Sequence, residues 1–261
     1  MTMTSVSTET TDNGFLGGRL QLLQPRRGYR AGVDPVLLAA SVAAQPGEAV
    51  LELGCGVGTA LLCLGSRVPG LALTGVELQR DYADLARENA ARNGLTAEVY
   101  TADLAALPAE LKARSFDQVL ANPPYFLRDA SHASAEPGRE TGRGEGLALA
   151  EWIAVAARRL RPGGFATFIQ RAERLPEMLT ACEGRLGALE VQPLAPRMGR
   201  AARLVLLRGR KAGRADFRLH APLVLHRGRA YLSDGDDYAP AISAVLRDGA
   251  ALPFGSAVDG A

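Results

Sequence analysis

Strand-like and helix-like segments alternate along most of this chain, and that alternation is the feature that most constrains its fold. Residues 48–68, "EAVLELGCGVGTALLCLGSRV", are typical of an apolar strand, a glycine-rich turn and an apolar helix. The alternation continues with strands expected at residues 72–78, 97–104, 116–124 and 165–170, and with helices expected at residues 34–44, 80–94, 147–164 and 175–187. This pattern predicts an α/β fold in which helices cover both faces of a mostly parallel sheet.

The pattern changes after residue 187. Short strands without intervening helices are expected at residues 188–196, 202–211, 217–228 and 229–235, so the sheet is predicted to end in antiparallel strands. Residues 1–14 are polar and rich in Ser and Thr, which predicts a disordered tail. No linker divides the remainder, and residues 15–261 are therefore predicted to form a single domain.

Composition excludes several classes of protein. With 261 residues and 47% hydrophobic content the chain can bury a large core, but its apolar runs are shorter than the roughly 20 residues that span a bilayer. The first residues lack the pattern of a secretion signal. Three cysteines and three histidines, without metal-ligand spacing, favour neither a disulfide framework nor a zinc site. We therefore expect a cytoplasmic protein with no membrane segment and no metal, and we make no prediction about its oligomeric state.

The glycine-rich turn "ELGCGVG" is the expected ligand site, because ligands bind beyond the carboxyl ends of parallel strands and glycine lets the backbone approach them closely. Gly54, Gly56 and Gly58 do not match the dinucleotide pattern G-x-G-x-x-G, since Gly58 comes one residue early. Glu52 is also badly placed for a diphosphate. A cationic ligand therefore fits this turn better, and Cys55 within it is predicted to be a small filler.

Two more acids end the next two strands. Glu77 ends the second strand of the pattern, where a carboxylate can accept both hydroxyl hydrogens of a ribose. Asp103 ends the third, and its carboxylate could either accept from the amine of an adenine ring or cap the segment that follows. The regular placement of three acids, Glu52, Glu77 and Asp103, at the ends of three successive strands predicts a ligand that contains a nucleoside.

The fourth strand stops at Asn122-Pro123-Pro124-Tyr125. A mechanical explanation is that prolines lack N–H donors and end the ladder, with a buried aromatic behind them. A chemical explanation is that a stiff turn holds one amide, one backbone carbonyl and one aromatic face around a planar substrate amine. The position of the turn, at the carboxyl end of the fourth strand, favours the chemical explanation.

Positive charge is concentrated in two segments, although the net charge is only +2. Residues 17–30 contain four arginines and no acid, and residues 196–220 contain seven arginines and one lysine against Asp216 alone. Such segments either discourage strand edges from pairing or contact phosphates. On the second interpretation, Arg208 and Arg210 are expected to contact RNA. Trp152, at a helical core position, is predicted to pack rather than to stack on a ligand.

The motifs "VLELGCGVG", "GVEL", "TADL" and "NPPY" resemble those of the S-adenosylmethionine-dependent methyltransferases of the Rossmann-like class I, and "NPPY" resembles the branch that methylates planar amino or amide nitrogens. The segments "FLGGRLQLLQPRRGYRAGVDPVLLAA" and "YAPAISAVLRDGAALPF" are similar to those of bacterial tRNA adenine-N6 methyltransferases, which modify an adenine next to the anticodon. The resemblance implies a seven-stranded sheet, S-adenosylmethionine as cofactor, and RNA, of the tRNA class, as the partner of the basic segments.

The resemblance also assigns roles to residues. It implies cofactor contacts by a set of acids and glycines: Glu52, Gly54, Gly56 and Gly58 around the methionine part, Glu77 on the ribose, and Asp103 on the adenine amine. Asp34 corresponds to an acid near the cofactor's amino group, but its position before Pro35 also fits a helix N-cap. Asn122 through Tyr125 form the implied catalytic motif.

Two alternatives share parts of this pattern. A protein glutamine amide also presents a planar nitrogen with two hydrogens, so a glutamine-N5 methyltransferase would use the same motif. Such enzymes usually carry a helical domain ahead of the core, for which the roughly thirty residues before the first expected helix leave little room. A non-catalytic nucleotide- or RNA-binding module is the other alternative, and the intact Asn122-Pro123-Pro124-Tyr125 argues against it.

Overall fold

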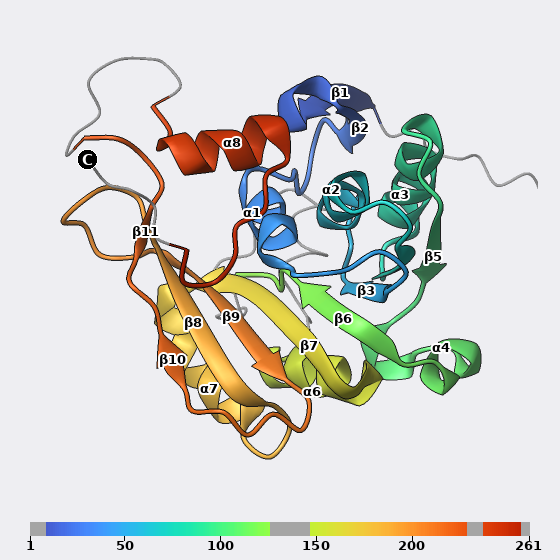
Figure 1. Ribbon diagram of the computed structural model, residues 1–261. Coiled ribbons are helices and arrows are strands. Elements are labelled where there is room, and N and C mark those ends of the chain that lie inside the picture. The colour runs from blue at the N-terminus through green and yellow to red at the C-terminus, as the bar shows by residue number, and fades with distance from the viewer. Residues whose placement is uncertain (1–8, 126–146, 229–236, 257–261) are drawn as a thin grey trace, which may run out of the picture.

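A computed structural model of the chain describes residues 9–125, 147–228 and 237–256 (Figure 1). Its main sheet has nine strands, two of them only two residues long. The strands are β3 (Ala49–Leu53), β4 (Ala72–Glu77), β5 (Ala97–Thr101), β6 (Phe116–Ala121), β7 (Leu160–Arg171), β8 (Gly187–Ala195), β9 (Leu204–Arg210), β10 (Arg218–Leu219) and β11 (Leu223–Val224). Their order is β10-β8-β9-β7-β6-β3-β4-β5, with β11 paired to β8.

The order of strands reverses at β3, which lies between β4 and β6. Both neighbours run parallel to β3, and Leu53 at the end of β3 pairs with Ala121 at the end of β6. The glycine turn and the Asn-Pro-Pro turn therefore leave the sheet side by side, at the position where parallel sheets bind ligands.

Helices cover both faces of this sheet (Figure 1). The helices are α1 (Asp34–Ser41), α2 (Thr59–Arg67), α3 (Arg80–Arg92), α4 (Ala109–Ala113), α6 (Leu149–Arg159), α7 (Leu175–Cys182) and α8 (Pro240–Asp248), and three 3-10 turns are η1 (Leu16–Gly18), η2 (Leu104–Ala106) and η3 (Ala172–Arg174). One core lies between the sheet and α1, α2 and α8, and the other between the sheet and α4, α6 and α7. The predicted fold class is confirmed, but the expected seven strands are nine in the described residues, because the two-residue strands β10 and β11 both pair with β8. None of these helices has the length and apolar content to cross a bilayer.

Some details differ from the predictions. Of the C-terminal strands only β9 runs antiparallel to its neighbours, whereas β8, β10 and β11 run in the common direction. The helix expected at residues 147–164 ends at Arg159, because Leu160 already pairs with Phe116 and starts β7. Helix α8 was not predicted. The sequence also predicts a polar, glycine-rich loop at residues 128–146, and this loop and the strand expected at residues 229–235 lie outside the described residues.

The predicted disordered tail is wrong for residues 10–14. They form most of β1 (Thr10–Phe15), which pairs antiparallel with β2 (Leu20–Pro25). The apolar residues that anchor this hairpin lie in β2, where Leu20 and Leu22 are buried, so β1 itself needs no apolar pattern. Residues 1–8 lie outside the described part of the chain, and the single domain stays a prediction.

Side-chain amides of α3 and of its C-cap residue complete the free edge of β2. Asn89 accepts from Leu23 N (2.7 Å) and donates to Leu23 O and to Val57 O (3.0 Å each). One turn later Asn93 accepts from Gln21 N and donates to Gln21 O (2.9 Å each). Since Val57 belongs to the glycine turn, Asn89 ties that turn, α3 and the hairpin together.

We expect Asn89→Ala to lower the free energy of unfolding by about 3 kcal/mol, because Asn89 is fully buried and the variant would leave the buried Val57 carbonyl and two half-buried backbone groups of Leu23 without their partner. Asn93→Ala is the matched control. It also removes three hydrogen bonds, but from a half-buried site that water can reach, and should cost about 1 kcal/mol. Denaturant unfolding of both variants measures the difference, and equal losses would contradict this role for Asn89.

Candidate active site

The glycine turn after β3 has a backbone that only glycine adopts easily. Gly54, Gly56 and Gly58 have φ angles of 63°, 54° and 85°. A Cβ on Gly54 would lie 2.5 Å from the Trp152 ring, so Trp152 packs against the turn, as predicted. A Cβ on Gly56 would meet nothing within 4 Å among the described residues. The turn is thus packed on one side and open at Gly56.

Glu52 lies on β3, two residues before the first glycine of the turn, and is 3% exposed. Its Oε2 accepts from Leu61 N (2.8 Å), in the first turn of α2, where backbone donors have no partner inside the helix. Burial raises the pKa of Glu52 well above its usual range, against the lowering effect of the Leu61 bond, and the charge of Glu77 raises it further. The carboxylate therefore supports α2 at an electrostatic cost.

Glu77, at the end of β4, holds the other side of the turn. Its Oε2 accepts from Gly56 N and its Oε1 from Gln79 N, both at 2.9 Å. Burial raises its pKa as well, while these amide bonds lower it. Neither Glu52 nor Glu77 forms an ion pair with a described residue. Two buried carboxylates without a neighbouring cation form a site suited to a cationic ligand.

Asp34 is not the N-cap of α1, which corrects one of its two interpretations. The cap position belongs to Val33, Asp34 is the first helical residue, and no side chain caps this end. Instead Asp34 accepts a hydrogen bond from the Tyr125 hydroxyl, across 91 residues of sequence. The long-range bond accounts for the acid at this position, and contact with the cofactor's amino group stays a prediction.

Asp103 caps the segment that follows it, as one of its two interpretations predicted. It is the N-cap of η2, and its Oδ1 accepts from Ala105 N at 2.8 Å. The side chain is exposed at the carboxyl end of β5. A contact with an adenine amine is compatible with this cap and stays a prediction.

The Asn-Pro-Pro-Tyr turn leaves β6 directly after Ala121. Asn122 is half-buried, and its Nδ2 donates to the hydroxyl of Tyr29 at 3.4 Å, a long hydrogen bond that turns Oδ1 away from Tyr29. The carbonyl oxygen of Pro123 accepts from Nε2 of Gln170 at 3.2 Å. Tyr125 is held through its hydroxyl by Asp34, and the guanidinium of Arg171 lies 6.0 Å from the centre of its ring.

Tyr29 is a site residue that the sequence did not reveal. Its side chain is 50% exposed, but its hydroxyl points to Asn122, and burial of that group together with the charges of Asp34 and Glu52 raises its pKa. Tyr82 of α3 fixes its backbone, with the Tyr82 hydroxyl accepting from Tyr29 N (3.0 Å) and donating to Tyr29 O (3.2 Å). The only local signal was an aromatic within a basic, irregular segment.

The basic segments are partly used by the fold. Arg30 donates to Thr11 and Asn13 side chains and so holds the hairpin. Arg208, expected to contact RNA, is instead 17% exposed, paired with Glu190 at 2.6 Å and stacked 4.5 Å from the Phe254 ring centre. That expectation is wrong for Arg208, because its charge is already neutralised inside the fold.

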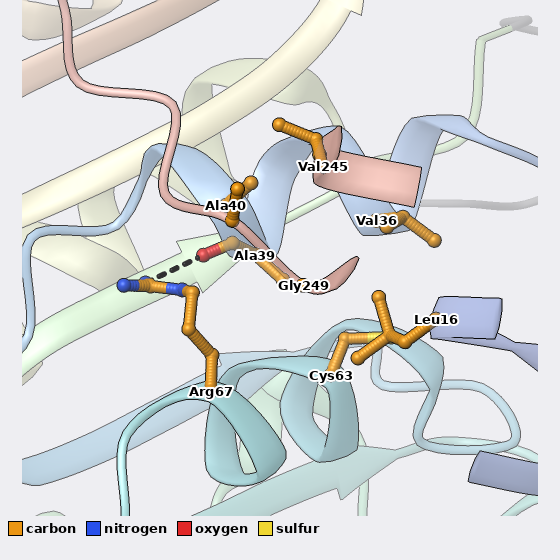
Figure 2. Close-up of a pocket in the computed structure, with 9 residues that line it drawn as sticks. Leu16, Val36, Ala39, Ala40, Cys63, Arg67, Val245 and Gly249 are labelled. Carbon is orange, nitrogen blue, oxygen red and sulfur yellow. Dashed lines mark hydrogen bonds between the residues drawn. The ribbon is translucent and has the colours of Figure 1, made fainter. Parts of the chain in front are cut away.

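A separate hollow between α1, α2 and α8 contains none of the predicted site residues (Figure 2). Arg67 points into it and donates to Ala39 O at 3.0 Å, at the carboxyl end of α1, where backbone acceptors lack partners. Burial lowers the pKa of Arg67. This arrangement supports a helix end and offers no site chemistry. Within the described residues, no three His, Cys, Asp or Glu side chains are grouped as metal ligands.

Comparison with known families identifies the chain. The model of the methyltransferase small domain family matches residues 32–190. This span is more than half of the chain and includes both turns of the site. The chain belongs to the methyltransferase small domain family.

Relatives of this methyltransferase include proteins named tRNA1(Val) (adenine(37)-N6)-methyltransferase. The one from Aeromonas hydrophila is 28% identical over 227 residues, covering 85% of this chain and 93% of the relative. The one from Dickeya chrysanthemi is 27% identical over 242 residues, covering 90% of this chain and 93% of the relative.

Solved structures show the same fold. A predicted O-methyltransferase of Agrobacterium tumefaciens superposes with a TM-score of 0.68 at 26% identity, over 85% of this methyltransferase and 100% of that chain. The Thermus thermophilus 16S rRNA N2 G1207 methyltransferase, solved with AdoMet and guanosine, has a TM-score of 0.54 at 22% identity, over 78% of this chain and 50% of that one.

We expect Glu52→Gln to make the ligand-free methyltransferase more stable at pH 7, by about 1 kcal/mol or about 2–4 °C in Tm, since an amide can still accept from Leu61 N without a buried charge. Because the pKa of Glu52 is raised in the folded state, the wild type loses stability as pH rises above the ordinary glutamate pKa, and the variant lacks this contribution while keeping that of Glu77. Thermal unfolding against pH measures this gap.

The gap between wild type and Glu52→Gln should close at a pH below the ordinary glutamate pKa, where the carboxyl is protonated in both folded and unfolded chains. Calorimetry should also show weaker S-adenosylmethionine binding by the variant, because one negative charge facing the cation is lost. A variant less stable than the wild type at pH 7 would contradict the electrostatic cost assigned to Glu52.

Proposed function

We propose that this methyltransferase transfers a methyl group from S-adenosylmethionine to the exocyclic N6 amine of an adenine in RNA, in tRNA near the anticodon, and acts in the cytoplasm. One observation carries the proposal: two acceptor oxygens, on Asn122 and Pro123, lie next to a site with two buried carboxylates that have no described counter-ion. These carboxylates belong to Glu52 and Glu77. The names of the full-length relatives support the same substrate.

S-adenosylmethionine is the cofactor, and the residues of the site fit it. It carries two positive charges on its methionine part, next to a nucleoside, and Glu52 and Glu77 provide buried negative charge without a described counter-ion. The open side of Gly56 leaves room for a ligand against the backbone. We assign Glu52 and the glycine turn to the methionine part, Glu77 to the ribose, Asp103 to the adenine amine, and Asp34 to the amino group.

The chemistry of the turn suits a weakly nucleophilic amine. Bound S-adenosylmethionine supplies the methyl group from its sulfonium. Oδ1 of Asn122 and the carbonyl of Pro123 each accept one hydrogen of the target amine, which draws the nitrogen toward a tetrahedral shape and its lone pair toward the methyl group. Tyr125, held by Asp34, stacks on the adenine, a contact worth about 1–3 kcal/mol.

Other acceptors make different demands on this site. A hydroxyl, the acceptor of an O-methyltransferase such as the one predicted from Agrobacterium tumefaciens, needs a base to remove its proton. The carboxylate of Asp34 is already bonded to Tyr125, and the Tyr29 hydroxyl has a raised pKa. A glutamine amide has the required two hydrogens and is the alternative that the substrate assay must separate.

The RNA surface that we propose consists of two loops at the carboxyl edge of the sheet. The first precedes α1 and contains Arg27 beside Tyr29; the second joins β8 to β9 and contains Arg200 and Arg203. All three arginines are exposed and form no hydrogen bond or ion pair through their side chains with the described residues. The second loop lies next to the end of β7, because Ala172 N, one residue after Arg171, donates to Arg203 O at 2.9 Å.

The double variant Arg27→Ala/Arg203→Ala should bind RNA more weakly and with a smaller salt dependence, by about one unit of log–log slope for each phosphate that the variant no longer neutralises. Arg214→Ala is the matched control, since Arg214 is equally exposed but follows β9 at the opposite edge of the sheet. Filter binding across a salt series measures both slopes. A double variant with the wild-type slope would remove these arginines from the RNA surface.

Transfer of labelled methyl from S-adenosylmethionine to tRNA, rRNA, duplex DNA and protein in parallel, followed by nucleoside analysis, tests the function directly. N6-methyladenosine in tRNA is the expected product. Label in protein would favour the glutamine alternative, and label in no pool would favour a non-catalytic binding module.

Asn122→Ala should reduce the rate of methyl transfer by about 10²–10³-fold, as expected when a preorganised hydrogen-bond partner is lost. The affinity for S-adenosylmethionine should change little, because the buried carboxylates remain. Single-turnover rates and calorimetric titration measure the two quantities. A variant with near wild-type transfer would contradict the role of the Asn122 oxygen.

A further inference from the structure

Gln170 lies beside the Asn-Pro-Pro turn for a reason of strand register. Strands β6 and β7 are parallel neighbours in which Ala121 pairs with Phe168. Two residues further along each strand, Pro123 and Gln170 are therefore level. Gln170 is completely buried and lies between the turn on one side and β9, where it pairs with Val205, on the other.

The amide of Gln170 can have only one orientation. Its Oε1 accepts from Arg171 N at 2.9 Å, which requires an oxygen, and its Nε2 donates to Pro123 O at 3.2 Å, which requires an N–H. Exchanging the two atoms would put donor against donor and acceptor against acceptor. The side chain is thus a fixed bridge from the backbone of β7 to the Pro123 carbonyl.

The turn needs such a bridge. Neither Pro123 nor Pro124 has an N–H, so the turn cannot be fixed by hydrogen bonds that these two residues donate, and the direction of the Pro123 carbonyl depends on a bond that it accepts. The proposed chemistry requires the carbonyl to present a free lone pair to one amine hydrogen of the substrate. A carbonyl oxygen has two lone pairs, and the bond from Gln170 occupies one while fixing the direction of the other.

We propose that Gln170 is a positioning residue for methyl transfer, which aims the Pro123 carbonyl at the substrate nitrogen. The inference rests on the proposed function, because the direction of the Pro123 carbonyl matters only if this carbonyl accepts a hydrogen bond from the substrate amine. Its contribution is geometric, since a second donor on the same oxygen does not strengthen that oxygen as an acceptor. Loss of Gln170 therefore lowers kcat and leaves the binding of cofactor and RNA unchanged.

Gln170→Met, which keeps the length of the side chain and removes the amide, should lower kcat by about 10–100-fold, the range expected for a misplaced reacting group. The KM for RNA and the Kd for S-adenosylmethionine should stay within about twofold of the wild type. Gln192→Met is the matched control: Gln192 is also buried, and it bridges Ala221 O and Gly255 N away from the turn. It should lose stability and keep kcat.

The pH dependence of kcat in Gln170→Glu tests the positioning role, because a merely structural role of residue 170 would not change that dependence. A protonated carboxyl can still accept from Arg171 N and donate to Pro123 O, whereas the ionised form turns an oxygen toward the carbonyl. The kcat of this variant, relative to the wild type, should therefore recover at low pH and fall as pH rises. The charged and titratable groups around the turn, namely Arg171, Asp34, Tyr125 and Tyr29, are the same in both proteins, so the difference belongs to position 170.

Several results would overturn the inference: wild-type kcat in Gln170→Met, an equal loss of kcat in Gln192→Met, or a Gln170→Glu profile parallel to that of the wild type. If Gln170→Met does not fold, as judged by cofactor binding, the pH profile of Gln170→Glu decides. Wild-type activity tests the function separately. Label in protein instead of RNA would overturn the proposed substrate, and the same variants would then be compared on the glutamine acceptor. A wild type that transfers no methyl group would overturn both the proposed function and the role of Gln170.

Discussion

Two buried carboxylates hold the glycine turn, and the rest of the site depends on them. Glu52 accepts from the first turn of α2, and Glu77 accepts from Gly56 and Gln79, so each satisfies backbone donors that the helix and the turn leave unpaired. Burial makes both charges costly, as their raised pKa values indicate. A cationic ligand offsets that cost, which couples the stability of the ligand-free protein to its affinity for the cofactor.

The part of the candidate site around the Asn-Pro-Pro turn is assembled from three distant parts of the chain. The turn after β6 provides Asn122 and Pro123, the loop before α1 provides Tyr29, and the end of β7 provides Gln170. Asn89 connects the neighbouring glycine turn to the hairpin, since it bonds both Leu23 of β2 and Val57 of that turn. Methyl transfer to a planar amine needs no strong base, so such a site can work through hydrogen-bond geometry alone.

Predictions from the sequence succeeded where the signal was local. Apolar runs ending in glycine, acid or proline located the strands β3, β4 and β6 and the turns that follow them. They failed where order came from a distant partner. The polar strand β1 is ordered by β2, Asp34 faces Tyr125 rather than its own helix end, and Arg208 is neutralised by Glu190. None of these partners is marked by spacing or periodicity.

The sequence by itself determined the α/β sheet, its carboxyl edge, and the acids and Asn-Pro-Pro turn that lie there, because strand propensity, glycine φ angles and proline's missing N–H act within a few residues. Only the tertiary structure decided which side chains hold Asn122 and the Pro123 carbonyl. Tyr29 reaches Asn122 across 93 residues and Gln170 reaches Pro123 across 47. Contacts over such distances follow from strand register and packing, which come into being only when the whole sheet is formed.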